Sequence, residues 1–422
     1  MKNIREGYKI TELGEIPESW NINKIGELTD IKTGGTPSTK CEEYWINGNI
    51  PWMVSGDVNK KIVNEVEGRI TNSGMENSAA KLLPKDTVMI ALNGQGKTKG
   101  TVAYLNIELT CNQSLAGFLP NNDVFNSKYL YYNLQSRYSE IRGLAGDGAR
   151  NGLNLGLLRD ILIPLPTIEE QEKIASILST VDEQIDNVDG LIQKNKELKK
   201  GLMQQLLTKG IGHTKFKNTE IGEIPEEWEV NSNFIIIKSG FGFKLKEYVY
   251  DGVPLIRINN VMYGRIIDDD LSYLPEEYVK SYKDFVLKKG DILLALNRPI
   301  TNNRLKIGIV NKEPAILYQR VGKLEFKTKK YLGEFFYQYM QSDKFIKVLE
   351  NTLVGSDQPY IKTSEFEKLK FPVPSIEEQQ KIVSILSEVD KKIEGYENKK
   401  YKLEELKKGL MQQLLTGRTR VI

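Results

Sequence analysis

The chain has 422 residues, 40% of them hydrophobic, which is enough for more than one domain with its own core. Lys and Arg number 59 and Asp and Glu number 56, so the net charge is only +3, and any affinity for nucleic acid must come from local basic faces. Two cysteines, Cys41 and Cys111, and one histidine, His213, argue against a disulfide framework, a His/Cys metal site and histidine-dependent nucleophilic catalysis.

The amino-terminal residues 1–7 lack the apolar stretch of a signal peptide. No later run approaches the roughly 18 consecutive apolar residues that a membrane span needs. We therefore expect a cytoplasmic protein without a membrane span.

The chain contains two copies of one unit. Three segments recur 208 residues later: Thr11–Trp20 as Thr219–Trp228, Ile168–Asp182 as Ile376–Asp390, and Lys199–Thr208, without change, as Lys407–Thr416. A duplicated protein has two equivalent surfaces, so this chain is expected to recognise or bridge two of something.

Residues 1–163 and 213–371 have the mixed pattern of α+β modules, each with its own core. Short apolar strands are predicted at Thr87–Leu92, Gly100–Leu105, Asp291–Leu296 and Ile307–Val310, and aromatic-rich helices at Ser127–Leu144 and Tyr331–Leu349. The aromatic residues are spaced as on the buried face of a helix, so we expect them in the core rather than as platforms for base stacking. They are Tyr129, Tyr131, Tyr132 and Tyr138, and Phe335, Phe336, Tyr337 and Phe345.

Residues 164–212 and 372–422 predict two long helices. Proline pairs precede each one, and Thr167 with Glu170, and Ser375 with Glu378, have the spacing of capping boxes. Apolar residues then recur every three or four positions, which lays a seam along each helix. The seams are Ile174, Leu178, Val181, Ile185, Val188 and Ile192, and Ile382, Leu386, Val389, Ile393 and Tyr396. They resume at Leu198, Leu202 and Leu206, and at Leu403, Leu406, Leu410 and Leu414, so the helices are expected to reach Thr208 and Thr416.

The connection between the helices favours an antiparallel pair. A helix of about 42 residues is on the order of 60 Å long, whereas a globular segment of about 160 residues has a radius of gyration near 15 Å. An antiparallel pair needs only a local reversal of the chain. We expect an α+β protein in which two globular domains are separated by a pair of long antiparallel coiled-coil helices.

The sequence contains no motif that indicates catalysis. Gly94–Thr98 resembles the end of a phosphate-binding P-loop, but Ala91 stands where its first glycine should be. Gly146-Asp-Gly148 is an isolated Gly-x-Gly. We expect the chain to catalyse no reaction by itself.

Polar, glycine-rich loops are the candidate binding residues. Their Lys and Arg side chains can contact phosphates, and Asn, Gln and Arg can recognise base edges in the major groove. The candidates in the first copy are Lys32, Thr36, Ser38, Lys40, Ser55, Asn59, Asn93, Gln95, Lys97, Lys99, Arg150 and Asn151. Those in the second copy are Lys244, Arg257, Asn259, Asn297, Arg298, Asn302, Arg304, Gln358 and Tyr360. Because these loops differ between the copies, they suggest two different ligands, such as two short DNA sequences.

The chain resembles, over its whole length, the DNA-specificity subunits of type I restriction–modification systems. The resemblance rests on Gly-Glu-Ile-Pro-x-x-Trp at the start of each copy, on Gly34–Ser38 before Asn49–Trp52 and Ser55–Asp57, and on Ile163–Gln171 leading into the first long helix. The second copy also matches at Gly355–Ile361 before Phe371–Pro374. The first copy has no Gln-Pro there, and the second lacks Gly-Gly-Thr-Pro, so contacts cannot be transferred between copies.

The resemblance implies a non-catalytic subunit made of a target-recognition domain (1–163), a spacer helix (164–212), a second target-recognition domain (213–371) and a second spacer helix (372–422). Each domain would recognise half of a bipartite, asymmetric site in double-stranded DNA. The helices, with their seam at Ile174, Leu178, Val181, Ile185, Ile382, Leu386, Val389 and Ile393, would set the spacing and dock two methyltransferase subunits.

The same resemblance implies that cofactors belong to the partners: S-adenosylmethionine on adenine methyltransferase subunits, and ATP and Mg on restriction subunits. No cofactor or metal is expected in this chain. Two alternatives stay open at this point: a coiled-coil scaffold that joins two protein-binding modules, and an orphan specificity subunit that only competes for partners.

Overall fold

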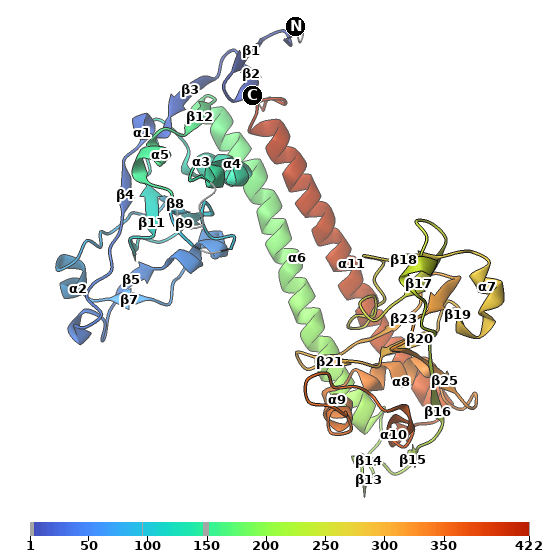
Figure 1. Cartoon of the computed structure of the whole chain (residues 1–422). Helices are drawn as coiled ribbons and strands as arrows, with labels where there is room; N and C mark the ends of the chain where they lie inside the picture. Colours follow the sequence, from blue (N-terminus) through green and yellow to red (C-terminus); the bar gives the residue numbers. More distant parts are fainter. Residues whose placement is uncertain (1–3, 95, 147–151, 422) are drawn as a thin grey trace. The chain divides into compact units, whose positions relative to one another are not determined.

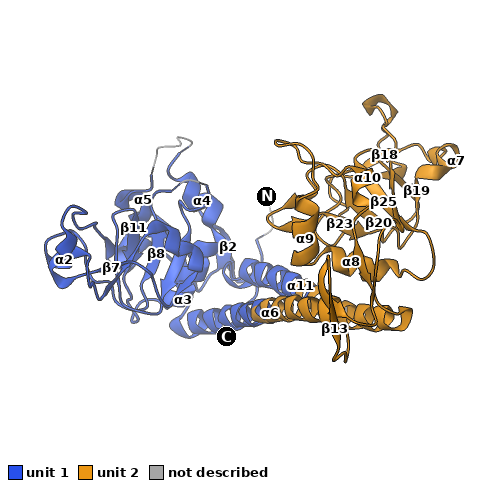
Figure 2. Cartoon of the chain, turned by 90° about the horizontal axis from the view of Figure 1, so that it is seen from below, with its two compact units in different colours: residues 1–189, 398–422 blue, residues 190–397 orange. Residues whose placement is uncertain are grey.

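The computed structural model describes residues 4–94, 96–146 and 152–421, which form two compact units. Unit 1 comprises residues 1–189 and 398–422, and unit 2 comprises residues 190–397 (Figure 2). Each unit therefore contains one globular module together with part of both long helices. Within the described residues, no helix is long and apolar enough to cross a membrane.

Unit 1 is built on two sheets and two short strand pairs. The larger sheet has the order β4 (Ile31–Thr33), β11 (Leu115–Phe118), β8 (Val88–Ala91), β9 (Val102–Leu105) and β6 (Ile62–Val63). The smaller has the order β10 (Thr110–Cys111), β5 (Ile50–Met53) and β7 (Arg69–Ile70). Strand β1 (Tyr8–Thr11) pairs with β2 (Gly14–Pro17), and β3 (Asn21–Lys24) pairs with β12 (Leu162–Leu165). Its short helices are α1 (Ile25–Leu28), α2 (Asn72–Glu76), α3 (Ser127–Ser136), α4 (Tyr138–Gly143) and α5 (Leu155–Arg159).

Unit 2 has corresponding sheets. One has the order β16 (Ile235–Ser239), β25 (Val321–Phe326), β20 (Ile292–Ala295) and β23 (Ile307–Ile309), and the other has the order β18 (Ser272–Leu274), β17 (Val253–Ile256), β24 (Ala315–Leu317) and β19 (Val286–Leu287). The strand pairs are β13 (Phe216–Thr219) with β14 (Gly222–Pro225), β15 (Glu229–Asn231) with β26 (Phe371–Val373), and β21 (Ile300–Thr301) with β22 (Arg304–Leu305). The short helices are α7 (Tyr278–Ser281), α8 (Gly333–Met340), α9 (Asp343–Glu350) and α10 (Thr363–Phe366).

The two units share one strand connectivity. The antiparallel order β4-β11-β8-β9 of unit 1 corresponds to β16-β25-β20-β23 of unit 2. The parallel pair of β5 with β10 corresponds to β17 with β24. The duplication seen in the sequence is therefore a duplication of the fold, and the predicted α+β class is confirmed.

The predicted strands and helices are found with modest changes of extent. All four predicted strands are present as β8, β9, β20 and β23, while each predicted aromatic helix is divided in two, as α3 with α4 and as α8 with α9. The aromatic side chains of these helices are buried, as expected, except for Tyr138, which is half-buried. The placement of Tyr138 in the core was therefore wrong, because its hydroxyl reaches outward to a loop carbonyl.

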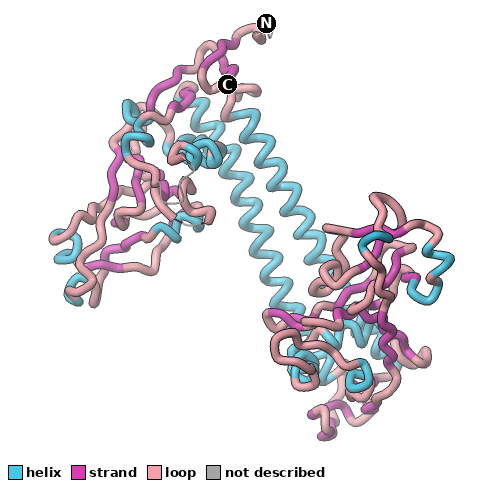
Figure 3. The backbone as a smooth tube through the Cα atoms, viewed as in Figure 1, coloured by secondary structure: helices cyan, strands magenta, loops and turns pink. Residues whose placement is uncertain are grey.

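The long helices α6 (Ile168–Lys209) and α11 (Ile376–Leu414) are continuous (Figures 1 and 3). In unit 1, Lys407 pairs with Asp182 and Lys400 pairs with Asp189, each at 2.7 Å. As the residue number rises along α6 it falls along α11, so the helices run antiparallel. In unit 2, Lys199 pairs with Asp390 at 2.7 Å and Lys196 with Glu397 at 2.9 Å, in the same antiparallel sense.

The seam between the helices is only partly as predicted. The eight seam residues at Ile174, Leu178, Val181, Ile185, Ile382, Leu386, Val389 and Ile393 are buried. In contrast, Leu198 and Leu406 are 52% and 50% exposed, so their expected place in the seam was wrong. Near these residues the inner face of each helix packs on a domain core, through Leu202 and Leu206 in unit 2 and through Leu410 and Leu414 in unit 1.

The acidic motif at the start of each long helix joins that helix to its domain. Only one of the two hydrogen bonds of each predicted capping box is found at the helix start. Thr167 Oγ1 accepts a hydrogen bond from the amide of Glu170, and Ser375 Oγ accepts one from the amide of Glu378. The two carboxylates instead accept hydrogen bonds from the buried indoles of Trp20 and Trp228. The prediction of capping boxes was therefore correct for the hydroxyl groups and wrong for the carboxylates of Glu170 and Glu378, because each carboxylate binds a tryptophan that is distant in the sequence.

The glutamine that follows makes a second link. The side chain of Gln171 donates to the carbonyl of Pro166 at 3.0 Å and accepts from the amide of Asn126, next to α3, at 2.9 Å. In unit 2, Gln379 donates to Pro374 and accepts from the amide of Leu332, next to α8, each at 2.9 Å. Glu and Gln of the repeated Glu-Glu-Gln sequence thus fix one module to one helix start.

Candidate nucleic-acid interface

In unit 1, three candidate loops leave the same edge of the sheets. Strands β4 and β8 are both antiparallel to β11, so they are parallel to each other and their carboxyl ends lie at one edge. The loop after β4 bonds to the segment before β11, through Thr36 Oγ1 to Gln113 Oε1 at 2.6 Å. The loop after β8 does so through the amide of Leu92 to the carbonyl of Ser114 at 2.9 Å. The end of β5 joins them, because Met53 accepts from the amide of Asn112 at 3.0 Å.

Most described candidates at this edge have free access to solvent. Exposed are Lys32, Thr36, Ser38, Lys40, Asn59, Asn93 and Lys97, and Ser55 is half-buried. Lys99 differs, since its side chain is buried. Gln95, Arg150 and Asn151 lie outside the described residues.

The loop between β8 and β9 is held in place by α4. Tyr138 donates to the carbonyl of Lys97 at 2.9 Å, and Arg142 donates to the carbonyl of Lys99 at 3.1 Å. Gly94 takes a φ of +144°, a conformation that other residues rarely adopt, which lets the loop turn sharply after Asn93. The carbonyls of Lys97 and Lys99 are therefore held by α4, while the side chains of Asn93 and Lys97 are exposed to solvent.

Unit 2 repeats this arrangement with different side chains. Strands β16 and β20 are both antiparallel to β25, so the loops that follow them also leave one edge. Those loops carry the exposed cations Lys244 and Arg298 and the half-buried Asn297.

A segment of the closing pattern, Val354–Ile361, lies beside the loop after β20. The amide of Arg298 donates to the carbonyl of Pro359 at 2.7 Å, and the amide of Ile361 donates to Leu296 at 2.8 Å. The exposed residues Gln358 and Tyr360 are thereby brought next to Asn297 and Arg298. In unit 1 the corresponding bond joins Leu153 to Leu92 at 2.9 Å, so residues that follow the undescribed stretch 147–151 meet the equivalent loop.

The remaining candidates of unit 2 belong to two other groups. Arg257 and Asn259 both donate to Asp270, at 3.3 and 3.1 Å, so an acid of this chain occupies them here. Asn302 and Asn303, at φ of 51° and 54°, form the tip of the β21–β22 hairpin. Arg304 follows, with its guanidinium 4.5 Å from the ring centre of Tyr263. Arg298 is thus exposed at the loop edge, whereas Arg257 is paired with Asp270.

Burial changes the acid–base behaviour of two groups near these surfaces. The thiol of Cys111, where the loops of unit 1 converge, has its pKa raised to about 12 by burial. The pKa of Lys407 is lowered by burial, against the opposing effect of Asp182. Among the described residues, no group of three or more His, Cys, Asp and Glu side chains is placed to hold a metal ion.

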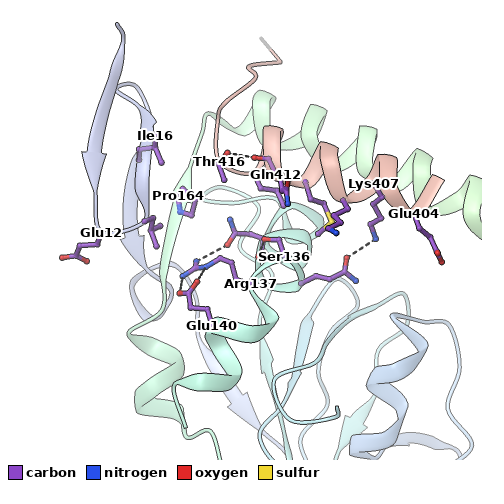
Figure 4. A pocket seen from close by; sticks show the side chains of 16 residues that line it. Glu12, Ile16, Ser136, Arg137, Glu140, Pro164, Glu404, Lys407, Gln412 and Thr416 are labelled. Carbon is purple, nitrogen blue, oxygen red and sulfur yellow. Dashed lines mark hydrogen bonds and ion pairs between the residues drawn. The ribbon is translucent and has the colours of Figure 1, made fainter. Parts of the chain in front are cut away.

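Unit 1 also has a groove away from the loop edge, with a volume of about 680 Å³. It lies between the β1–β2 hairpin, the α3–α4 junction and the last turns of α11 (Figure 4). Leu13, Ile16, Met411 and Leu415 make part of its wall apolar. Arg137 and Glu140, which bond to each other, add charge to the wall.

Comparison with known proteins identifies the family. Residues 17–198 and 212–405 match the model of the type I restriction modification DNA specificity domain. The chain belongs to this family of specificity subunits. It is 34% identical to the MjaVIII specificity subunit of Methanocaldococcus jannaschii, over 99% of this chain and 96% of that protein, and 27% identical to the MjaIX specificity subunit of the same organism, over 98% and 96%.

The fold agrees with this membership. A crystal structure of the type I restriction–modification S subunit from M. genitalium superposes with a TM-score of 0.60 at 21% identity, over 96% of this chain and 97% of that one. The resemblance proposed from the sequence is confirmed: this specificity subunit is the DNA-recognition component of its system and not the catalytic one. The alternative of an unrelated protein-binding scaffold is thereby set aside. The domain bounds and the contact residues drawn from the sequence stay predictions.

Proposed function

We propose that each globular module of this specificity subunit recognises one half of a bipartite, asymmetric site in double-stranded DNA. The observation that carries the proposal is the shared strand connectivity with different loops at the equivalent edge. A common frame places both sets of loops in the same way, and different side chains on it select different sequences. In unit 1 the proposed selecting side chain is Asn93, and in unit 2 the proposed selecting side chains are Asn297 and Arg298.

The proposed division of labour follows from the chemistry of these groups. Lys97 and Lys244 are exposed cations suited to phosphates, and their contribution should weaken as salt rises. Asn93 and Asn297 can each bond to two atoms of an adenine edge, and Arg298 to a guanine edge.

The proposal includes the partners. Two adenine methyltransferase subunits would dock on the helix pair, one for each half-site, and would bind S-adenosylmethionine. Restriction subunits that use ATP and Mg would join them to cleave unmodified DNA. These cofactors would be held by the partners.

Mapping methylated adenines in cells tests the proposal. A host without other adenine methylation would receive the modification subunit of the same system, with or without this chain. The expected result is methylation at one bipartite, asymmetric sequence that depends on the chain. Methylation without it, or at a single undivided sequence, would contradict the proposal.

A further inference from the structure

One turn at the loop edge carries the same exposed side chain in both units. The turn that leads into β11 is Asn112–Leu115, and the turn that leads into β25 is Tyr318–Val321. The two turns are equivalent, because the last residue of each pairs with the last residue of β8 or of β20. The second residue of both turns is a glutamine, Gln113 or Gln319, whereas the residues on each side of it differ. The glutamine has therefore been kept while its neighbours have diverged.

Each turn lies where the loops of its unit converge. In unit 2, the backbone of the turn Tyr318–Val321 donates to Phe241, in the loop after β16, at 3.0 Å and to Ile256, at the end of β17, at 3.1 Å. It accepts from the amide of Leu296, after β20, at 2.9 Å. The turn of unit 1 meets the loops after β4 and β8 and the end of β5 in the same way. Both glutamines are exposed, so each is accessible to a molecule that covers the loop edge.

Contacts inside the chain do not account for the shared glutamine, because they differ between the units. Oε1 of Gln113 accepts a hydrogen bond from the hydroxyl of Thr36 at 2.6 Å. The residue equivalent to Thr36 is Gly242, and Gln319 instead donates from Nε2 to the hydroxyl of Tyr318 at 3.3 Å. The turn itself does not require glutamine, since turns favour Gly, Pro, Asn, Asp and Ser. The identity therefore indicates a ligand group that both units share.

Two half-sites of different sequence still have one base pair in common. The proposed function gives each half-site to one of two identical adenine methyltransferase subunits, so each half-site contains a target adenine and the thymine paired with it. A methyltransferase flips its target base out of the helix, which leaves that thymine without a partner. The thymine then offers the acceptor O4 and the donor N3–H. Side chains that differ between the units suit the bases that differ, and a shared side chain suits this shared thymine.

The amide of glutamine matches the two free groups of the thymine. It carries N–H donors beside a carbonyl acceptor, which is the combination that adenine presents to thymine in a base pair. Among the described residues, Nε2 of Gln113 has no hydrogen-bond partner, and Oε1 has a second lone pair besides the one that Thr36 uses. A second shared amide, Asn93 in unit 1 and Asn297 in unit 2, adjoins the turn, because the residue before it donates to the turn at 2.9 Å. The shared side chains thus lie close together, as contact with one common base pair requires.

We propose that Gln113 and Gln319 each pair with the thymine opposite the target adenine of their half-site once that adenine is flipped out. The amide nitrogen donates to O4 and the amide oxygen accepts from N3–H, so the glutamine replaces the adenine and stabilises the flipped state. The inference rests on the proposed function, which supplies an adenine in each half-site. It gives the glutamines a role in positioning the substrate, whereas divergent residues such as Arg298 select the sequence.

Duplexes that lack this thymine test the pairing. The full chain would be assembled with the modification subunit of the same system, and DNA affinity would be measured by fluorescence anisotropy in S-adenosylhomocysteine, which permits no methyl transfer. Gln113→Ala should weaken binding of the intact site by about 5- to 150-fold, the range expected for a lost bidentate base contact. When an abasic site replaces the thymine in the half-site of unit 1, the variant and the wild type should bind equally, because neither can make the contact.

The two units provide matched controls for each other. Gln319→Ala should show a similar loss on the intact site, and this loss should disappear only when the thymine of the other half-site is replaced. Gln113→Glu keeps the length of the side chain but lacks the N–H donors, so it should bind the intact site no better than Gln113→Ala does. The substitutions lie at exposed positions, so thermal unfolding should match that of the wild type.

The outcomes separate the inference from the proposed function. A wild-type complex that does not methylate a bipartite site with an adenine in each half contradicts the proposed function. A wild-type complex that does so, with a Gln113→Ala loss that persists on both abasic duplexes, overturns the thymine contact alone and assigns the glutamine to another base or to a phosphate. An unchanged affinity of Gln113→Ala for the intact site overturns the contact as well.

Discussion

The indole nitrogen of Trp228 donates a hydrogen bond to Oε2 of Glu378 across 2.9 Å, although 150 residues separate them in the chain. The same carboxylate accepts from the amide of Ile211 and lies 3.0 Å from Nε2 of His213. In unit 1 the equivalent carboxylate of Glu170 accepts from Trp20 at 3.1 Å and from Arg420, which binds it with two nitrogens. In each unit, one largely buried carboxylate thus joins three segments: the start of one long helix, the tryptophan that follows the first hairpin of the module, and the chain that follows the other long helix.

Replacing Trp228 by phenylalanine tests this junction. The variant should lower the free energy of unfolding by about 1–3 kcal/mol, because an acceptor on a largely buried carboxylate loses its donor. Thermal and denaturant unfolding would measure the change. Trp45→Phe is the matched control: its indole donates to Ser38 at an exposed site, so a loss within about 0.5 kcal/mol is expected. Equal losses in the two variants would assign the effect to ring size and not to the carboxylate.

Local patterns in the sequence predicted the helices, the strands and the duplication well. Seam residues such as Leu178 and Leu386 could be placed because helical periodicity depends only on near neighbours. The partners of Glu170 and Glu378 could not, since the short-range capping spacing gives no information about a tryptophan 150 residues away.

The candidate interface was predictable as a list of loops but not as a surface. Its convergence depends on the order β4-β11-β8, in which strands distant in sequence are neighbours. The burial of Lys99 and the engagement of Arg257 by Asp270 likewise depend on the packing of other segments. From composition alone, all of these cations were expected to be equally accessible for binding DNA.

The half-site assignment predicts independent effects of the two loop edges. The double variant Asn93→Ala, Lys97→Ala should relax or weaken recognition of one half-site only. A lost base contact should cost about 1–3 kcal/mol of binding free energy at that half-site. A lost phosphate contact should leave the sequence preference intact and reduce the slope of log affinity against log salt concentration by about one. Selection of binding sites from a random pool, performed with the assembled methyltransferase at several salt concentrations, would measure both.

The corresponding double variant of unit 2 provides the control for that experiment. Asn297→Ala with Arg298→Ala should affect the other half-site and leave the first unchanged. If either double variant relaxed both halves equally, the assignment of one half-site to each module would be wrong.

The cysteines should differ in reactivity. Cys41 is half-buried and Cys111 is buried, with its thiol pKa raised from 9.0 to about 12. Because the thiolate is the reactive form, the native chain at pH 8 should react with one equivalent of a chromogenic thiol reagent, and the unfolded chain should react with two equivalents. Rapid reaction of both thiols in the native state would contradict the burial of Cys111, and Cys41→Ser should abolish the native signal.

The same shift predicts a loss of stability in alkali. Below pH 9 the thiol of Cys111 is protonated in both the folded and the unfolded chain, so it contributes no pH dependence. Between pH 9 and about 12 the unfolded chain loses this proton while the folded chain retains it, so the free energy of unfolding should fall as pH rises. Tyr337, whose pKa burial raises from 10.0 to about 12, should act in the same direction. Denaturant unfolding of Cys111→Ala across this range should show a shallower decline than the wild type does.

The helix pair should set the spacing between the two half-sites, which are expected about one DNA turn, roughly 34 Å, apart. A matched insertion of seven residues in both helices, between Ile192 and Lys196 and between Glu397 and Lys400, keeps the ion pairs of each unit and the apolar seam. It adds roughly 10 Å at 1.5 Å per residue, which equals at most about three base pairs of 3.4 Å. The added length is partly offset because the DNA must also twist to keep both half-sites facing the protein. Sequencing of methylated adenines should then show the same two half-sequences separated by about one to three more unspecified base pairs. Active variants that retained the original separation would show that the helices only dock the partners, and that DNA spacing is set elsewhere.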